Sequence, residues 1–397
     1  MFYKIIIKII IFIIIGLYYN INLISKLYNF ISYISFKNEI KVIDYYLNIC
    51  KNFKIIKKFK IMRNTKISII SPIYNRERFI FRFLTSIQFQ DFSDIEIILV
   101  DDYSIDNSVK IIEDYKKKDE RIILIKNKNN KGTFVARNIG VLYAKGKYVI
   151  LPDPDDILLK STISFCYNNA EKYNYEIIRF SSYVGNEKIG NEKYVQKLGN
   201  KPVYYPLLST NIFYGYGELE MIDFNINDKF IKTQTYIKAL NCLNNFYFNM
   251  HIIFMEDQLM NYILLTIAKS FYFSKRIGYY YLNNEMSITK NINKITKTRI
   301  KFIFIYLKMV FEYSKNTKYA KDMLNLLFTH LNKQFNIENN LANLSSKEDL
   351  NFYNDIINLY LNCKFITNEN KYYFNHLKNI IKNKLNYITF ILKNINF

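Results

Sequence analysis

The chain has 397 residues, a formal net charge of +22, heavy use of Lys, Asn, Ile, Tyr and Phe, and no Trp. It is long enough for one large α/β core with appended segments. Because the lysines are scattered along the whole chain, the charge does not indicate a nucleic-acid partner and predicts only weak attraction to anionic lipids or phosphates. The 4 Cys are far apart and only 3 His accompany them, which argues against a zinc site and a disulfide framework.

The first segment, residues 1–24, is an almost continuous apolar run interrupted by Lys8. If Lys8 snorkels and the run extends from Ile5 towards Ile24, it can cross a bilayer, so we expect a single-pass N-terminal signal anchor. A cleaved signal peptide and a plain consequence of the Ile-rich composition are the alternatives. Lysines on both sides leave the orientation in an endomembrane or plasma membrane open. Residues 25–64 mix apolar and basic positions and predict a stem of amphipathic helices.

From residue 65 onwards, short apolar runs alternate with amphipathic segments. We expect strands at 66–71, 95–100, 121–125 and 148–151, and helices at 77–88, 106–119 and 133–144. Strands and helices in regular alternation predict a mainly parallel, doubly wound α/β sheet with flanking helices.

Polar residues follow the first two strands. The first strand runs into S-P-I-Y-N-R-E, where Pro72 and Asn75 interrupt it and Tyr74 offers a flat ring that can stack on a base. The second ends in V-D-D-Y-S-I-D-N-S and delivers Asp102 to its carboxyl end. The carboxyl ends of parallel strands meet at one edge of the sheet, where open α/β sheets bind ligands. We therefore expect these residues to lie in one site.

The helices that follow the second and third strands begin with their own polar signals. Ser104 and Asp106 are candidate caps for the helix at 106–119. The third strand leads into N-K-N-N-K-G-T-F-V-A-R-N-I-G, where Gly132 allows backbone to approach a ligand at a helix amino end that favours anions. Lys131 and Arg137 are candidate diphosphate contacts, although a surface charge is the alternative for Arg137.

The fourth strand ends in a concentration of carboxylates, Y-V-I-L-P-D-P-D-D-I-L from Tyr148 to Leu158. Asp153, Asp155 and Asp156 repel one another unless a divalent cation, or a ligand that comes with one, neutralises them. The alternative is a turn rich in Asp and Pro whose carboxylates are solvated.

These motifs, in this order and at these spacings, resemble the nucleotide-sugar half of a family 2 glycosyltransferase with the GT-A fold. The resemblance implies transfer of a sugar, with inversion, from a nucleoside-diphosphate sugar, a UDP-sugar first among them, to a hydroxyl of a glycan, lipid or protein acceptor. It implies that the base and ribose are held by Pro72, Tyr74, Asn75, Glu77 and Asp102. It further implies that Mg or Mn is bound through the diphosphate by a D-x-D element, with basic residues nearby: Asp153 and Asp155, beside Lys131 and Arg137.

An inverting transfer also needs a base that deprotonates the acceptor hydroxyl. The segment H-I-I-F-M-E-D-Q-L-M-N-Y-I-L-L opens an apolar helical pattern with Glu256 and Asp257. Two acids at a helix start also suit the helix dipole without any catalytic role. The family carries an E-D pair at this point, so the resemblance implies that Asp257 is the catalytic base and that Glu256 supports it.

The sequence thus predicts a catalytic domain at 65–295, divided into a nucleotide-sugar half at 65–158 and an acceptor half at 159–295. Helical spacing over 296–397 predicts a helical C-terminal region packed on the core or on the membrane. Weaker candidates in the acceptor half are Lys229, for which a solvated face is the alternative, and the phosphate contacts Tyr281, Ser287 and Thr289.

Two other functions use the same residues. A haloacid-dehalogenase-like phosphohydrolase also places D-x-D after an apolar strand, with Asp153 as nucleophile and Asp155 as acid. That family carries the motif on its first core strand, whereas here it closes the fourth. A non-catalytic protein that retains only the nucleotide-sugar pocket is the second alternative.

Overall fold

The computed structural model describes residues 65–185, 193–195, 201–204, 225–243, 248–253, 256–282, 296–314, 347–362 and 368–394. The chain divides into two compact units, and all of these residues belong to the second, Ile55–Phe397. The expected membrane segment at 1–24 and stem at 25–64 lie outside the described residues, as do Ser287 and Thr289. Within the described ranges no helix is long and apolar enough to cross a membrane.

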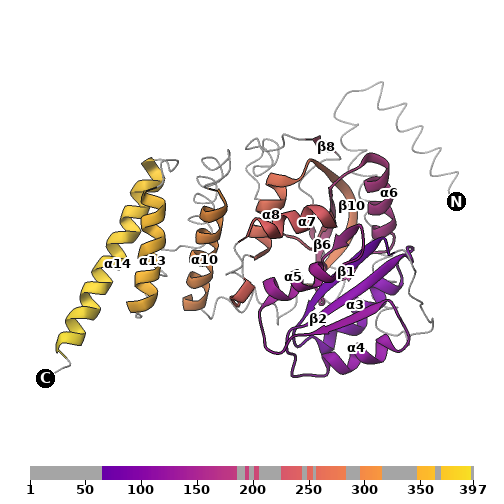
Figure 1. The fold of residues 1–397 in the computed structure, drawn as a ribbon, viewed down its shortest axis with the longest axis horizontal. Coiled ribbons are helices and arrows are strands. Elements are labelled where there is room, and N and C mark those ends of the chain that lie inside the picture. Colours follow the sequence, from indigo (N-terminus) through magenta and orange to yellow (C-terminus); the bar gives the residue numbers. More distant parts are fainter. Residues whose placement is uncertain are drawn as a thin grey trace, which may run out of the picture. The chain divides into compact units, whose positions relative to one another are not determined.

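Residues 65–158 alternate strands and helices as the sequence predicts (Figure 1). The strands are β1 (Ile67–Ile73), β2 (Ile95–Asp101), β3 (Ile122–Lys126) and β4 (Tyr148–Ile150), and the helices between them are α3 (Glu77–Gln88), α4 (Ser108–Lys116) and α5 (Thr133–Tyr143). These strands pair in parallel in the order β3-β2-β1-β4. Each of the expected elements is therefore confirmed, with small shifts at the ends.

The second half makes the sheet mixed. Its further elements are β5 (Ile157–Leu158), α6 (Thr162–Tyr173), β6 (Ile177–Gly185), β7 (Lys193–Val195), β8 (Lys201–Tyr204), β9 (Lys229–Lys232), α7 (Thr233–Asn241), α8 (Glu256–Ile267) and β10 (Ser270–Leu282). The sheet continues from β4 through β9, β6 and β10 to β5, and β9 is antiparallel to both β4 and β6. The prediction of a mainly parallel sheet is wrong for this half, because a segment from much later in the chain inserts between β4 and β6.

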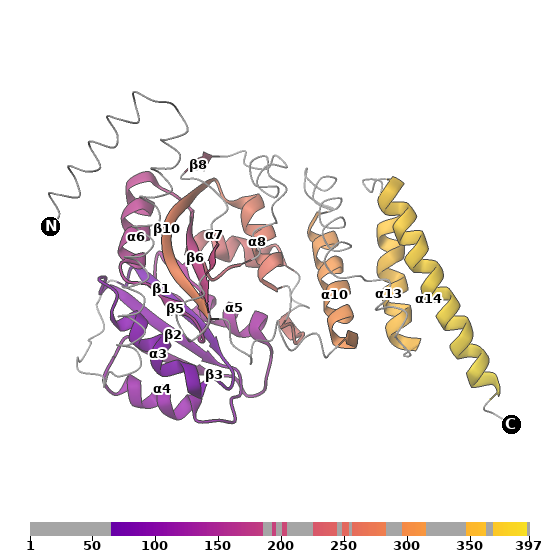
Figure 2. The ribbon, with the colours of Figure 1, turned by 180° about the vertical axis from the view of Figure 1, so that it is seen from behind.

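Helices cover both faces of the sheet (Figures 1 and 2). Successive strand residues point to opposite faces. Ile70 and Val100 pack in one apolar cluster with α5, α7 and α8, whereas Ile69 and Leu99 pack in another with α3, α4 and α6. At Gly140 on α5 an added Cβ would lie 2.3 Å from Ile70 Cγ2, so the glycine allows the helix to contact β1 closely. Burial on both faces explains why the strands are continuous apolar runs.

Among the described residues, the helices after β10 are α10 (Thr296–Ser314), α13 (Lys347–Leu361) and α14 (Asn368–Asn394). Aromatic side chains connect them. The rings of Phe304 and Tyr353 stack at 4.4 Å between α10 and α13, and those of Tyr360 and Phe374 stack at 4.9 Å between α13 and α14. The Tyr360 hydroxyl donates to the Leu307 carbonyl at 2.7 Å. The predicted helical C-terminal region is therefore present in the described residues.

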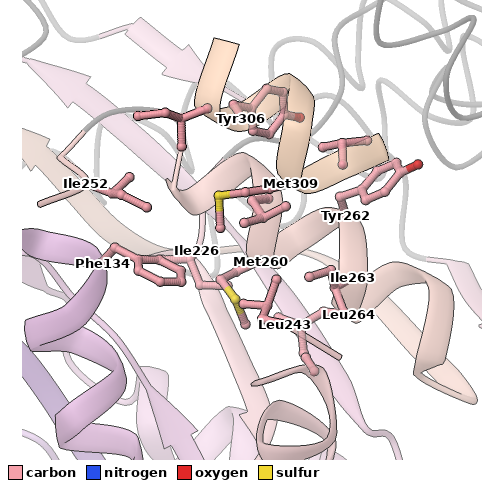
Figure 3. Packing of buried hydrophobic residues seen from close by; sticks show 14 of the residues in the cluster. Phe134, Ile226, Leu243, Ile252, Met260, Tyr262, Ile263, Leu264, Tyr306 and Met309 are labelled. Carbon is pink, nitrogen blue, oxygen red and sulfur yellow. The ribbon is translucent and has the colours of Figure 1, made fainter. Parts of the chain in front are cut away.

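The helix α10 packs on the apolar cluster that covers one face of the sheet. Figure 3 shows Tyr306 and Met309 of α10 in one apolar cluster with Met260 of α8, Phe134 of α5 and Ile226. These five side chains are at least 96% buried. The cluster joins the segments that carry the candidate site, so α10 stabilises the position of α8.

Candidate active site

The loops after β1 and β2 are joined by hydrogen bonds that involve the predicted residues Asn75 and Glu77. The Asn75 amide donates to Ser104 Oγ at 3.0 Å, and Asn75 Oδ1 accepts from the Ile105 amide at 2.9 Å. Glu77 Oε2 accepts from both the backbone and the side-chain nitrogen of Asn107, each at 2.9 Å. Asn75 has a φ of 52°, a left-handed conformation that Asn tolerates. The two loops therefore form one rigid rim.

The cap assignments divide between two residues. Asp106 Oδ1 accepts from the Ser108 amide at 2.9 Å at the start of α4, so its predicted cap role is confirmed. Of the two alternatives that the sequence offered, Asp106 is therefore the cap, and the Ser104 hydroxyl instead accepts from the Asn75 amide of the neighbouring loop. Along the same rim, Pro72 is buried in β1 and Tyr74 is 43% exposed. The exposed ring is available to a ligand, and its base contact stays a prediction.

Asp102 is 2% exposed and holds the loop that precedes α5. Its Oδ1 accepts from Asn127 Nδ2 at 2.8 Å and from the Lys131 amide at 2.9 Å, and its Oδ2 accepts from the Gly132 amide at 2.7 Å. The anion expected near the amino end of α5 is thus this carboxylate. The sequence placed Asp102, Lys131 and Gly132 in one site but did not reveal that they bind one another.

Gly132 lets this loop contact the segment before α8. Its φ is 86°, and an added Cβ would lie 2.7 Å from the Ile252 carbonyl oxygen. The Phe134 amide donates to that oxygen at 3.2 Å, and His251 Nε2 lies 2.9 Å from Asn130 Oδ1. The end of β2 is therefore connected, through the loop before α5, to the segment that leads to Glu256.

Arg137 brings the two predicted acidic motifs together. The Arg137 side chain is 4% exposed, Nη2 donates to Asp153 Oδ1 at 2.9 Å, and Nη1 donates to Asp257 Oδ1. Glu256 Oε1 lies 3.7 Å from Nη1. The alternative of a surface charge is therefore wrong for Arg137. The guanidinium also supplies the neutralising charge that the sequence assigned to a cation or ligand alone.

Burial governs the ionisation of the two acids that open α8. Burial and the Asp257 charge together raise the pKa of Glu256 to about 8. The pKa of Asp257 rises to about 6, mainly through burial and against the opposing effect of Arg137. At neutral pH Glu256 therefore retains its proton and Asp257 is ionised, which suits a base supported by a neutral neighbour.

The three acids of the fourth strand end have different surroundings. Asp156 is buried and accepts from the Tyr279 hydroxyl and the Leu282 amide, both at 2.8 Å. The same Tyr279 oxygen accepts from the Asp153 amide at 2.9 Å. Burial raises the pKa of Asp156 well above its usual value, with further contributions from Asp155 and Asp153. Asp156 thus fixes the loop, while the other two carboxylates remain partly exposed.

The donor set of Asp153 and Asp155 fits a hard divalent cation. The side chains are 26% and 17% exposed. In the described residues no three His, Cys, Asp or Glu side chains form a ready metal cluster. Mg²⁺ characteristically uses one or two carboxylates together with substrate phosphates rather than an all-protein cage, so two carboxylates at the edge of a ligand site match its requirements.

The segment before β9 adds one site residue that sequence reasoning missed, Asn227. Asn227 Nδ2 donates to Asp153 Oδ2 at 3.0 Å. Lys229 is 1% exposed and donates to the Asn225 carbonyl and to Asp228 Oδ1, so the solvated face considered for it is wrong. No local signal identified Asn227, because its position depends on the insertion of β9 beside β4.

The amino-terminal part of the chain matches a known family model. Residues 68–231 match the model described as Glycosyl transferase family 2. Poly(ribitol-phosphate) beta-glucosyltransferase of Bacillus spizizenii is 31% identical over 221 residues, which cover 55% of this chain and 32% of that protein. Glycosyltransferase GlyG of Streptococcus pneumoniae is 34% identical over 125 residues, which cover 32% of this chain and 42% of that protein. The aligned regions thus span less than two thirds of either relative.

Solved structures share the fold over a larger part of the chain. The crystal structure of S. aureus TarS 1-349 in complex with UDP-GlcNAc covers 83% of this chain and 92% of that one, with a TM-score of 0.59 and 18% identity. A second crystal structure of S. aureus TarS 1-349 has a TM-score of 0.57 and 16% identity to this chain. The mixed sheet and its flanking helices are therefore of the GT-A type. The family match, the curated relatives and this fold agree, and the chain contains a family 2 glycosyltransferase domain.

Proposed function

We propose that the chain is an inverting glycosyltransferase that uses a nucleoside-diphosphate sugar, with UDP-sugars first, and a hydroxyl acceptor on a glycan, lipid or protein. The observation that carries the proposal is the position of Arg137 between Asp153 and Asp257. One guanidinium spans the donor-side carboxylate and the base candidate, so a donor and an acceptor bound at these two groups would meet. The relatives named as glycosyltransferases, and the similar fold of a protein crystallised with UDP and UDP-GlcNAc, support this reading.

The proposed reaction is a direct displacement at the anomeric carbon. Asp257 takes the proton of the acceptor hydroxyl while the oxygen of that hydroxyl forms a bond to the anomeric carbon. The bond from the carbon to the diphosphate oxygen breaks, and the nucleoside diphosphate leaves with the electron pair. Neutral Glu256 adds no second negative charge beside the base at neutral pH.

The diphosphate would be bound on the Asp153 side of the site. Asp153 and Asp155 would hold Mg or Mn together with the diphosphate, and the cation would supply positive charge to the leaving group. Arg137 contacts Asp153 and adds positive charge from the protein, and Lys131 in the loop before α5 would be a second basic contact for the diphosphate. Tyr74 would stack on the base, while Asp102 keeps the loop before α5 in place for the ribose.

The test separates binding from transfer. UDP-sugars and GDP-sugars are screened for hydrolysis and for thermal stabilisation of the protein with and without Mn²⁺. Asp257→Asn is expected to retain nucleotide binding and to lose transfer by about 10²-fold or more, the usual contribution of a general base. Asp155→Ala is expected to lose the metal-dependent part of nucleotide binding.

Other results would contradict the proposal. Full transfer activity in Asp257→Asn would show that another base acts, and unchanged metal-dependent binding in Asp155→Ala would remove the D-x-D assignment. Phosphate release from simple phosphomonoesters that Asp153→Asn abolishes would favour the phosphohydrolase. Nucleotide-sugar binding without transfer to any acceptor would favour a non-catalytic binding protein.

We also propose that residues 1–24 hold the protein at a membrane as a single-pass anchor. The apolar run of that segment supports the proposal. The full chain is expected to float with lipid vesicles, whereas a chain that starts at residue 25 is expected to remain in the soluble fraction. Co-flotation of the shortened chain would assign membrane binding to another part of the protein.

A further inference from the structure

Tyr103 has an unfavourable backbone conformation at the edge of the candidate site. Its φ is 71°, and the other non-glycine residues with positive φ in the described part of the chain are Asn75, Ser161 and Asn174. Asn is one of the residues that tolerates this region, whereas a bulky aromatic residue there is a genuine outlier. The backbone at this position would accept glycine or asparagine more easily than tyrosine. The sequence nevertheless has tyrosine.

The contacts that hold this conformation come from the neighbours of Tyr103. Asp102 on one side accepts three hydrogen bonds from the loop before α5. On the other side the Ser104 amide donates to Asp101 Oδ1 at 3.3 Å, and the Ser104 hydroxyl accepts from Asn75. The loop is therefore fixed without help from the tyrosine ring.

The Tyr103 ring is left facing solvent. It is 54% exposed, and among the described residues it makes no hydrogen bond, ring contact or ion pair. Within the described residues, the Tyr103 ring thus makes no contact of its own that offsets the energetic cost of a bulky side chain at this φ. Strained residues that the surroundings hold in place concentrate at ligand sites, so the outlier supports a role in binding.

The position of Tyr103 indicates which part of a ligand it meets. At the ends of β1 and β2, Ile73 pairs with Asp101, and the Asp102 amide donates to the Ile73 carbonyl at 2.7 Å. Tyr74 and Tyr103 follow these residues in sequence and therefore extend from adjacent strand ends. β4, which leads to Asp153, lies on the far side of β1 from β2. Two strand spacings, about 10 Å, therefore separate the end of β2 from the diphosphate side.

Asp257 opens α8, and Arg137 joins it to Asp153. A nucleotide whose diphosphate lies at Asp153 can place its nucleoside at the ends of β1 and β2. The exposed rings of Tyr74 and Tyr103 lie there, 43% and 54% exposed.

We propose that Tyr103 is a donor-binding residue whose ring, with that of Tyr74, packs on the nucleoside of the donor nucleotide. This inference rests on the proposed function, since it takes the ligand at Asp153 to be a nucleoside diphosphate. Aromatic rings stack on any base, so affinity comes from the ring face rather than from the hydroxyl group.

The experiment compares Tyr103→Asn with Tyr103→Phe in the full chain. Calorimetry with Mn²⁺ measures the binding of UDP, GDP and inorganic pyrophosphate. Asparagine accepts the left-handed backbone, so Tyr103→Asn is expected to keep the melting temperature of the wild-type protein within about 2 °C, or to raise it. It is expected to bind UDP about ten-fold more weakly, the loss typical of one base-stacking ring, with unchanged affinity for pyrophosphate. Tyr103→Phe is expected to bind UDP as the wild type does.

A matched control is Tyr143→Asn, which removes a similarly exposed ring, 62% exposed. Tyr143 is the last residue of α5, at the end of the helix away from the loop that binds Asp102. It is expected to leave UDP binding unchanged. Equal UDP affinity in Tyr103→Asn and wild type would overturn the inference, as would an equal loss for pyrophosphate or a melting temperature more than about 5 °C lower. Wild-type protein that binds neither UDP nor GDP would instead overturn the proposed function, and this inference with it.

Discussion

The charge balance of the candidate site depends on one side chain. The buried guanidinium of Arg137 contacts Asp153 and Asp257 and lies 3.7 Å from Glu256. Buried charges are tolerated when they are paired, and removing one member of a buried pair leaves the others without compensation. Arg137 thus stabilises the apo site, and its two nitrogens set the separation between the donor and acceptor groups.

Replacement of Arg137 tests this balance. Arg137→Met is expected to lower the free energy of unfolding at pH 7 by about 3–5 kcal/mol, because carboxylates remain buried without a partner. The added substitution Asp257→Asn is expected to restore part of that loss, which urea unfolding of the single and double variants measures. Arg276→Met, at an exposed arginine whose guanidinium lies 5.0 Å from the Phe165 ring, serves as control and is expected to cost about 1 kcal/mol or less. Additive losses in the double variant would contradict the shared role.

The pH profile of transfer tests the assignment of the base. The pKa of Asp257 is raised to about 6, because burial and the Asp153 charge outweigh the opposing effects of Arg137 and Lys229. The base acts in its ionised form, so kcat/KM is expected to fall about ten-fold per pH unit below pH 6 and to level off above it. Glu256, with a pKa of about 8, does not produce this acid limb. Parallel titrations of UDP affinity identify any change in donor binding, and a flat profile between about pH 5 and 7 would contradict the assignment.

At the scale of elements, β10 positions the loop that carries the D-x-D residues. The Tyr279 hydroxyl connects the Asp156 carboxylate to the Asp153 amide, and the Leu282 amide binds the other Asp156 oxygen. β5 also pairs with β10 through Tyr279 and Tyr280. The end of a strand more than a hundred residues away in sequence thus holds the loop between β4 and β5 from two sides.

Removal of the Tyr279 hydroxyl tests this connection. Tyr279→Phe is expected to lower the free energy of unfolding by about 1–3 kcal/mol, since buried Asp156 loses a hydrogen-bond donor and the Asp153 amide loses its acceptor. The KM for the donor is expected to rise while the KM for the acceptor stays constant. Tyr306→Phe is the control, because the Tyr306 ring is buried on α10 and its hydroxyl binds none of the described residues. Equal effects of the two substitutions would contradict a specific role for Tyr279.

On the scale of the whole molecule, α8 lies between the sheet and the C-terminal helices. One apolar cluster contains residues of β1, α5, α7, α8, α10, α13 and α14, and Figure 3 shows the part of it where α5, α8 and α10 meet. α8 begins with Glu256 and Asp257, so the packing of α10 on α8 contributes to the position of the proposed base, Asp257. The C-terminal helices therefore stabilise the site through the packing of α10 on α8.

A substitution at that interface measures this contribution. Met309 of α10 is 2% exposed, and Met309→Ala is expected to lower the free energy of unfolding by about 2–5 kcal/mol through the cavity that it leaves. Tyr372→Ala on α14, where the side chain is 79% exposed, is expected to change it by about 0.5 kcal/mol or less. Equal stability of the two variants in chemical unfolding would show that α10 is not part of the core.

The sequence by itself determined the elements of the amino-terminal half, the strand ends at which the polar motifs lie, and the start of α8 at Glu256. Periodicity records the burial of each segment, which is a local property. It did not determine the partners of the polar groups. Asp102 binds the loop before α5, and Asp156 binds Tyr279 rather than sharing the site of Asp153.

Only the tertiary structure decided how the two halves meet. The insertion of β9 between β4 and β6 brings Asn227 to Asp153. Arg137 joins Asp153 to Asp257, which lies 120 positions after Arg137 in the sequence. Such contacts depend on how whole elements pack, because a carboxylate is held by the nearest donor in space and not by its neighbours in sequence.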